Sequence, residues 1–189
     1  FALVEGAFRV AVGVSQQDGH VFGDGVAQRF RYFHAGTADS FLGDLHYDAV
    51  GRDDAQPFLI RTNPVFEDIL QFIKNGADMV LCSGGMSVDP DDRTPGAIKA
   101  TGTRIVSYGA PVLPGAMMLV SYYEKDGRQI PILGLPGCVM YAKNTIFDLL
   151  LPRLMADDEI TLSEINQLGE GGLCLNCDVC TFPNCGFGK

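Results

Sequence analysis

Basic residues are scarce in this sequence. Its 189 residues include 14 lysines and arginines against 23 aspartates and glutamates, so the formal net charge is −9 at pH 7. Binding to nucleic acids or to anionic membranes requires positively charged patches. The charge balance therefore argues against both, and we expect neither a nucleic-acid nor a membrane partner.

Long apolar runs and a leader pattern are missing as well. No stretch approaches the about 20 apolar residues of a membrane-spanning helix, and no signal-peptide pattern opens the chain. The first residue is Phe1 rather than methionine, so we expect some N-terminal sequence to be missing. With 47% hydrophobic residues, the chain can bury one sizeable core. We expect a soluble cytoplasmic protein.

Histidines are few and cysteines are unevenly placed. The three histidines show no metal-ligand spacing, and Cys82 and Cys138 each stand alone. The other four cysteines lie within the last sixteen residues in the pattern C-x2-C-x2-C-x4-C: Cys174, Cys177, Cys180 and Cys185. A disulfide framework spreads its cysteines through the fold, so this clustering favours a metal site in a reducing compartment.

Tetrahedral zinc and an iron–sulfur cluster both match four thiolates on one looped backbone. Ferredoxin-like runs share the two C-x2-C steps, but their third gap is shorter and proline follows where this chain has Gly186. Four-thiolate zinc sites usually bring two pairs from separated segments. The spacing favours iron–sulfur slightly over zinc, and free thiols in a disordered tail are the remaining alternative.

Strands alternating with helices indicate an α/β fold with a mainly parallel sheet. Pro131 is expected to place part of its strand at a sheet edge. The predicted strands cover residues 8–14, 45–50, 78–83, 103–109 and the two arms of a hairpin around 124–127. The predicted helices cover 26–34, 64–75 and 95–101, the third with Thr94 as its N-cap. A long helix is predicted from Gly137 to near Pro152, and a short one after Thr161, where Thr161 and Glu164 suit a capping box. We expect a main domain over 1–158, followed by a short helix and a Cys-rich tail over 159–189.

A glycine turn and an acidic loop follow the strand at 78–83. The stretch reads SGGMSVDPDDRTP, from Ser83 to Pro95. In open α/β sheets ligands bind beyond the carboxyl ends of the strands, and glycines there allow close approach of a phosphate. Aspartates beside a phosphate need a divalent cation or a proton-transfer role. The stretch therefore predicts a phosphate-bearing ligand with magnesium. The alternative is a solvated loop whose aspartates only cap turns.

A second glycine-proline turn, Gly134-Leu135-Pro136-Gly137, follows a later predicted strand. Taken in order with the first stretch, it resembles the molybdopterin-binding domain of molybdenum-cofactor biosynthesis over about residues 8–155. That family carries a strand ending in Gly-Gly, a Ser-Val loop and Asp-x-Thr, which here is Asp92 to Thr94. On this resemblance the ligand-binding residues are Ser83, Gly84, Gly85, Ser87, Thr94, Pro114, Gly115, Gly134, Pro136 and Gly137.

The resemblance implies a three-layer α/β/α sandwich and a homo-oligomer. It implies that the Gly84-Gly85 turn and Ser87 hold the phosphate side of molybdopterin. Asp92 becomes the functional aspartate, and Asp89 is the predicted magnesium ligand. The implied chemistry is either magnesium- and ATP-dependent adenylylation of molybdopterin or insertion of molybdate.

Three positions depart from the family pattern. Asp89 stands where a glycine is usual, Ala116 where a lysine follows Pro-Gly, and Cys138-Val139 where Asn-Pro is usual. These departures keep two other hypotheses open. One is a non-catalytic molybdopterin carrier, or a redox or metal sensor that uses the cysteine tail. The other is an electron-transfer protein whose main function lies in that tail.

Overall fold

The computed structural model describes residues 10–14, 64–86 and 92–189, all within one of the two units into which the chain divides. The predicted helix at 26–34 and strand at 45–50 lie outside the described residues. The same holds for two predicted site residues, Ser87 and Asp89.

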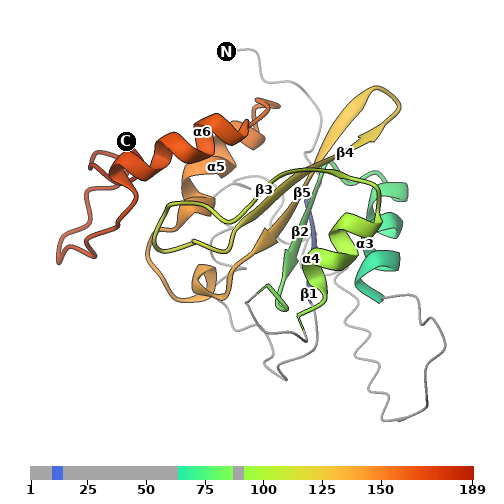
Figure 1. The fold of residues 1–189 in the computed structure, drawn as a ribbon, viewed down its shortest axis with the longest axis horizontal. Helices are drawn as coiled ribbons and strands as arrows, with labels where there is room; N and C mark the ends of the chain where they lie inside the picture. Colours follow the sequence, from blue (N-terminus) through green and yellow to red (C-terminus); the bar gives the residue numbers. More distant parts are fainter. Residues whose placement is uncertain (1–9, 15–63, 87–91) are drawn as a thin grey trace, which may run out of the picture. The chain divides into compact units, whose positions relative to one another are not determined.

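A five-stranded sheet forms the centre of the described unit (Figure 1). Its order is β1-β2-β5-β4-β3, with parallel pairing of β1 with β2 and of β2 with β5, and antiparallel pairing of the rest. The strands are β1 (Val10–Val14), β2 (Met79–Ser83), β3 (Arg104–Tyr108), β4 (Leu119–Lys125) and β5 (Arg128–Leu135). The predicted α/β class is confirmed, and the sheet is mixed because the β4–β5 hairpin reverses direction.

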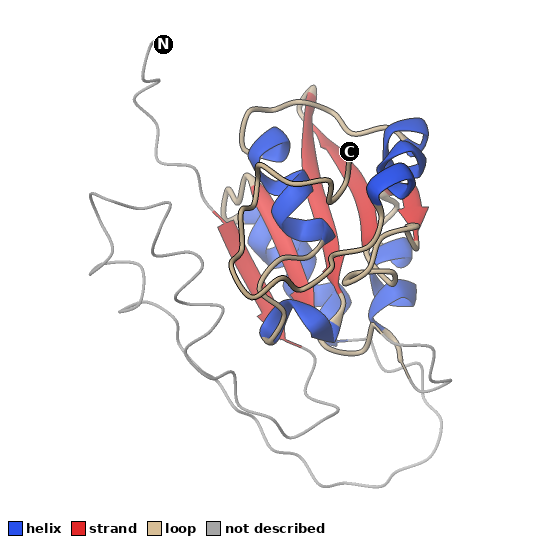
Figure 2. Cartoon of the chain, turned by 90° about the vertical axis from the view of Figure 1, so that its left-hand side faces the viewer, coloured by secondary structure: helices blue, strands red, loops and turns tan. Residues whose placement is uncertain are grey.

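Helices cover both faces of this sheet, as Figure 2 shows, so the sandwich has three layers. They are α3 (Pro64–Lys74), α4 (Thr94–Ala100), α5 (Ile146–Leu154) and α6 (Leu162–Gln167), with 3-10 turns η2 (Gly137–Met140) and η3 (Leu168–Gly171). In the described part of the chain, no helix is long and apolar enough to cross a membrane.

Helix α3 follows the signals in its sequence closely. Pro64 opens it, where a missing amide hydrogen costs nothing, and Lys74 lies in its last turn, where a cation complements the helix dipole. Gly76, at φ +89°, ends it in the left-handed conformation that glycine adopts readily. The buried stripe of Ile69 and Ile73 then packs on the sheet.

The two sheet faces build two halves of the core. On the α3 and α4 side, the buried cluster is Ile69, Ile73, Ala77, Val80, Cys82, Met86, Ile98, Leu119, Ile130 and Ile132. On the other side, α5 buries Leu150 and Leu154, and the hydroxyl of Tyr122 accepts a hydrogen bond of 2.8 Å from the Ile160 amide. Burial on both faces explains why β2 is apolar at every position but its last.

Of two local predictions, the first is confirmed and the second was wrong. Within the described residues Arg128 to Pro131 pair with β4 alone, because pairing of β5 with β2 begins only at Ile132, so this part of the strand lies at an edge while the rest of β5 lies between β2 and β4. The single long helix after Gly137 is instead η2 followed by α5. The break lies at Thr145, whose hydroxyl accepts from the Phe147 amide while the Asp148 carboxylate accepts from the Thr145 amide. This capping box starts a new helix.

Candidate functional site

The carboxyl ends of the strands meet at one edge of the sheet. Val14 of β1 pairs with Ser83 of β2, which pairs with Leu135 of β5. Tyr108, the last residue of β3, pairs with Leu119, whose other partner is Gly134. The connections that follow β2, β3 and β5 therefore leave the sheet side by side. Both predicted motif turns lie at the edge where open α/β sheets bind ligands.

One part of this edge, here called the aspartate corner, comprises Gly84, Asp92, Thr94 and Tyr108. Gly84 has φ +84° and Gly85 has φ +60°, so the strand ends in two consecutive left-handed residues. The buried hydroxyl of Thr94 donates a 2.8 Å hydrogen bond to the Gly84 carbonyl. This bond ties the glycine turn to the first residue of α4.

Thr94 was expected to cap α4, and that detail was wrong. The helix begins with Thr94 itself, and the N-cap position is Arg93, which makes no side-chain cap. Because its hydroxyl is committed to Gly84, Thr94 fixes the shape of the turn instead. The predicted stop is confirmed at Gly102, which has φ +81°.

Asp92 carries an unusual carboxylate. Its Oδ2 atom is buried and has no hydrogen-bond partner within the described residues. A buried carboxylate oxygen left without a partner costs free energy. Burial first, and the charge of Asp92 second, raise the pKa of the Tyr108 phenol. Sequence analysis missed Tyr108, and its available signal was its position as the last residue of a strand at the ligand edge.

A second part of the edge, the thiol corner, surrounds a cavity of about 420 Å³. It brings together predicted motif residues from two connections with the end of the chain. Its lining is Leu113, Pro114, Gly115, Ala116, Met117, Pro136, Cys138, Tyr141, Leu173 and Cys174. Predicted residues from both proline-glycine pairs thus meet one tail cysteine, whereas Ser83, Gly84, Gly85 and Thr94 do not line this cavity.

The motif glycines of this region differ in what they contact. A side chain at Gly115, which has φ +123°, would lie 3.1 Å from the Ile146 backbone nitrogen, with the Ile146 methyl group closer still. At Gly134 it would lie 2.6 Å from the sulfur of Met86. Nothing lies within 4 Å of the corresponding point at Gly137. Gly115 and Gly134 therefore serve packing, and Gly137 leaves open space.

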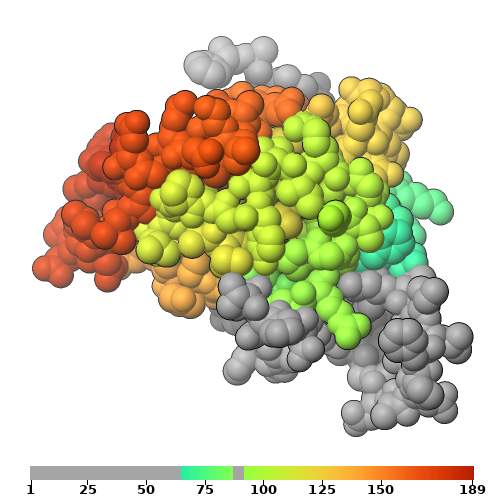
Figure 3. All heavy atoms as spheres, viewed as in Figure 1, coloured from blue at the N-terminus to red at the C-terminus, as the bar shows by residue number. Residues whose placement is uncertain are grey.

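The last residues, 172–189, form a closed segment that we call the tail loop. At its start, the Leu113 amide donates to the Gly172 carbonyl at 2.6 Å and the Cys174 amide donates to the Leu113 carbonyl at 2.8 Å. At its end, the Gly188 amide donates to the Gly171 carbonyl at 2.6 Å. The loop lies at the surface, beside the connection that precedes β4 (Figure 3).

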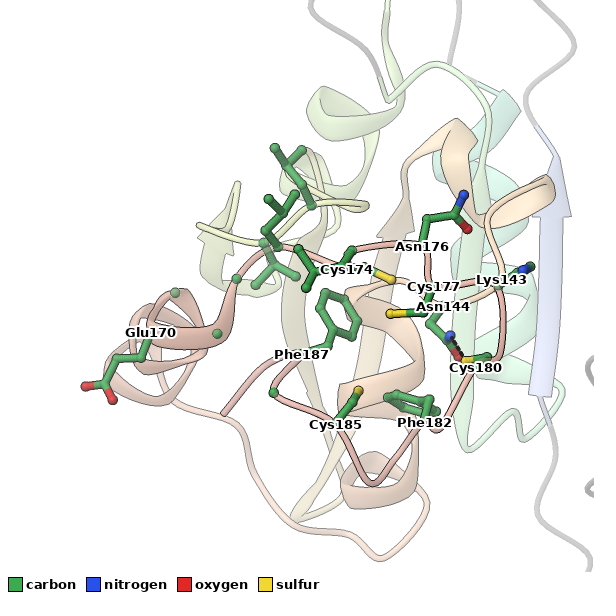
Figure 4. A pocket seen from close by; sticks show the side chains of 18 of the residues that line it. Lys143, Asn144, Glu170, Cys174, Asn176, Cys177, Cys180, Phe182, Cys185 and Phe187 are labelled. Atoms are coloured by element: carbon green, nitrogen blue, oxygen red, sulfur yellow. Dashed lines mark hydrogen bonds between the residues drawn. The ribbon is translucent and has the colours of Figure 1, made fainter.

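All four tail cysteines line a larger cavity of about 780 Å³ (Figure 4). None of the six cysteines, all of which are described, forms a disulfide. Cys180 is turned towards Asn144, whose amide donates to its sulfur at 3.2 Å. A backbone hydrogen bond from Phe182 first, and Asn144 second, lower the pKa of the Cys180 thiol. Sequence analysis missed Asn144, which belongs to the unpredicted break before α5.

The tail cysteines do not yet surround one point. Over residues 10–14, 64–86 and 92–189, no three Cys, His, Asp or Glu side chains stand close enough to hold a metal ion. The donor chemistry thus matches the predicted metal site, while the present arrangement of the sulfurs does not. By contrast, Cys82 is a buried residue of β2, and burial raises its thiol pKa to about 12.

Comparison with known proteins identifies the class of this domain. Residues 63–156 match the family described as "Probable molybdopterin binding domain", and over these residues the chain belongs to that family. The matched range contains both corners except for the tail cysteine and Leu173, so the tail loop lies beyond it. The resemblance predicted from the two motifs is confirmed.

Two solved structures are similar to the chain. A structure of MogA is 21% identical, with 83% of this chain and 97% of that chain covered and a TM-score of 0.43. A structure of the molybdopterin biosynthesis enzyme MoaB from Thermus thermophilus is 17% identical, with 82% and 99% covered and a TM-score of 0.41. No curated protein matches the chain.

Proposed function

We propose that this protein binds molybdopterin at the carboxyl edge of its sheet and acts on it during molybdenum-cofactor biosynthesis. The phosphate side of the pterin binds at the Gly84-Gly85 turn, and its sulfur-bearing side reaches the thiol corner. Family membership over residues 63–156 supports the ligand class. The observation that carries the proposal is the buried Oδ2 of Asp92 beside the glycine turn, which has no hydrogen-bond partner among the described residues.

That oxygen atom fits a role towards a bound group. A carboxylate can hold a divalent cation or take a proton, and either role gives the orphaned Oδ2 a partner. Asp92 would act as metal ligand or base, with Asp89 as the predicted magnesium ligand. Magnesium would supply charge neutralisation between the carboxylates and the phosphates.

The proposed reaction is one of two. In adenylylation, a phosphate oxygen of molybdopterin attacks the α-phosphorus of ATP and pyrophosphate leaves. In molybdate insertion, the two thiols of molybdopterin form two bonds to molybdenum, and one molybdate oxygen leaves as water with the two thiol protons, so the oxidation state of molybdenum does not change. For either, the chain's contribution is to position the phosphate at the glycine turn and to keep a carboxylate beside it. Assembly into a homo-oligomer stays a prediction, which light scattering would check, and a cytoplasmic location stays a prediction too.

A molybdopterin carrier, or a sensor that uses the tail cysteines, is the second candidate. Ala116 lines both cavities, at a position where the family pattern carries a lysine. A missing cation there removes one partner for phosphate charge and weakens transition-state stabilisation more than binding. Under this alternative the protein holds molybdopterin without changing it.

The test compares wild type with Asp92→Asn under anaerobic conditions. Each is mixed with molybdopterin, Mg-ATP and molybdate, and the pterin species are followed by mass spectrometry. We expect adenylylated or metallated product from wild type and a rate lower by about 100-fold or more in the variant. Asp126→Asn, a charge-matched change in the exposed β4–β5 turn, should match wild type.

The other outcomes separate the candidates. Bound but unchanged molybdopterin in all three proteins would favour the carrier or sensor. Equal product from wild type and Asp92→Asn would remove Asp92 from the chemistry. Absence of binding in every protein would rule out the proposed ligand.

A further inference from the structure

The tail loop is closed by backbone hydrogen bonds at both ends but buries few apolar side chains. Of its residues, all of which are described, Phe187 alone is buried. Leu175 and Val179 are 77% and 78% exposed. Loops of this length without helix or strand are uncommon in compact domains, and small elements without a core usually need disulfides or a structural metal. Apolar packing alone therefore does not explain what holds the residues of this loop together.

Its own side chains supply one candidate. Cysteine provides four of the loop's residues, none forms a disulfide, and all four line the same cavity. Asp178 is the only acidic residue of the loop, and the Lys189 ammonium donates to the Pro183 carbonyl. Thiolates are thus the donor set, and thiolate sulfur selects zinc or iron–sulfur centres over magnesium or calcium.

We propose that the tail loop binds one four-thiolate metal centre, and that this centre couples to ligand binding in the thiol corner. The four ligands are Cys174, Cys177, Cys180 and Cys185. A zinc ion and an iron–sulfur cluster share this chemistry. The coupling rests on the proposed function, and the metal site does not.

The positions of the cysteines suit assembly around a metal. Cys174 is held at its backbone by Leu113, and Cys185 lies two residues before the buried Phe187. Both are half-buried, whereas Cys177 and Cys180 are exposed. The two anchored thiols define the site, and the two exposed ones turn inward when the metal binds. Asn144, which already donates to the Cys180 sulfur, orients that ligand from outside the loop.

Shared residues connect the metal site to the thiol corner. Cys174 lines both cavities, as do its neighbour Leu173 and two residues of the connection before β4, Leu113 and Ala116. Fixing the Cys174 sulfur on a metal therefore fixes one wall of the cavity that contains Pro136. By linkage, a ligand that prefers the fixed wall strengthens metal binding by the same factor.

The first experiment tests the metal without any pterin. The full chain, purified anaerobically, is analysed for zinc, iron and sulfide. The metal-free chain is then titrated with Co²⁺ and followed by thiolate-to-cobalt charge-transfer absorption. We expect one centre per chain, loss of the intact four-sulfur spectrum in Cys177→Ser, and affinity lower by about tenfold or more in Asn144→Ala. Asp178→Asn, a change within the same loop that spares the thiols, should match wild type.

Metal analysis separates the two centres, since zinc alone indicates a zinc site and iron with sulfide indicates a cluster. Absence of a metal in the purified protein, together with no thiolate spectrum on titration and four reactive tail thiols, would overturn the metal site. An unchanged spectrum in Cys177→Ser would overturn the four-thiolate ligand set.

The second experiment tests the coupling. Molybdopterin affinity is measured for the metal-loaded and the metal-free chain, and we expect at least a roughly fivefold difference. Measurable but equal affinities would overturn the coupling and leave the proposed function standing. If molybdopterin binds neither form, the proposed function and the coupling both fail, while the metal result stands on its own spectrum.

Discussion

The two corners of the carboxyl edge differ in the atoms that they offer. The aspartate corner presents oxygen, from the Asp92 carboxylate and the Tyr108 phenol, behind a glycine turn. The thiol corner presents sulfur from Cys138 and Cys174 within a mainly apolar lining. Oxygen suits hard cations and phosphate, whereas sulfur suits soft metals.

This difference shows how one edge can select a ligand with two unlike groups. Molybdopterin carries a phosphate and a pair of sulfurs, and these two groups match the two corners in chemistry. The corners also differ in how completely their groups are packed or hydrogen-bonded within the structure. Gly115 is packed tightly against α5, whereas Asp92 keeps an oxygen atom without a partner in the described residues. Substitutions at Gly115 and at Asp92 test this difference between the two corners.

The largest expected effect on stability is at Gly115, in the tightly packed thiol corner. Gly115→Ala places a methyl group against Ile146, which is fully buried at the first turn of α5, and forces a non-glycine residue to φ +123°. Strain and overpacking together should cost about 3 kcal/mol of the free energy of unfolding. Denaturant unfolding followed by circular dichroism measures this loss.

Gly137→Ala is the matched control, because nothing lies within 4 Å of the added methyl group. Its stability should stay within about 0.5 kcal/mol of wild type. Equal losses in the two variants would contradict the division of the motif glycines into packed and open positions.

Much of the fold was predictable because local signals and burial agree. The start of α3 at Pro64, its stop at Gly76 and the Thr161 capping box of α6 all match expectation. Pro131, which has no amide hydrogen to donate, lies as expected in the part of β5 that pairs with β4 alone among the described strands. Thr145 was overlooked because an apolar stripe on either side of it suggested one continuous helix.

The site was predictable only in part, for a similar reason. Motif order grouped Pro114 and Pro136 as ligand-binding residues, and both line one cavity. It gave no means to see that Cys174 reaches the same cavity, since that contact depends on the pairing of Leu113 with Leu173 across the fold. The same holds for two other residues. The neighbours of Tyr108 depend on the strand register, and those of Asn144 depend on the break before α5.

A smaller effect is expected at Glu164 of α6, which forms an ion pair with Arg153 of α5. Hydrogen bonds from the Thr161 hydroxyl and amide, and then from Arg153 of α5, lower the pKa of Glu164 to about 2. A folded-state pKa below the ordinary 4.5 favours folding fully above pH 4.5, and this contribution is lost as the pH falls towards 2.

Glu164→Gln should therefore lower the melting temperature at pH 7 by less than Gly115→Ala does, and the difference from wild type should shrink as the pH falls from 4.5 to 2. Melting curves across this range measure it. Glu170→Gln, the same change of charge in the adjoining turn η3, serves as the control. A difference that grows on acidification would show that the Thr161 and Arg153 contacts do not stabilise the charged carboxylate.

The smallest effect on stability is expected at Asp92, the residue on which the proposed function depends most. Asp92→Asn removes a negative charge whose Oδ2 atom has no partner within the described residues, so the folded state loses no hydrogen bond from that atom. We expect a melting temperature equal to or above that of wild type, together with loss of turnover. A clear drop in melting temperature would mean that the fold itself uses the carboxylate. Groups that serve function often cost stability. An unchanged or higher melting temperature would therefore indicate that the aspartate corner serves ligand binding and not the stability of the fold.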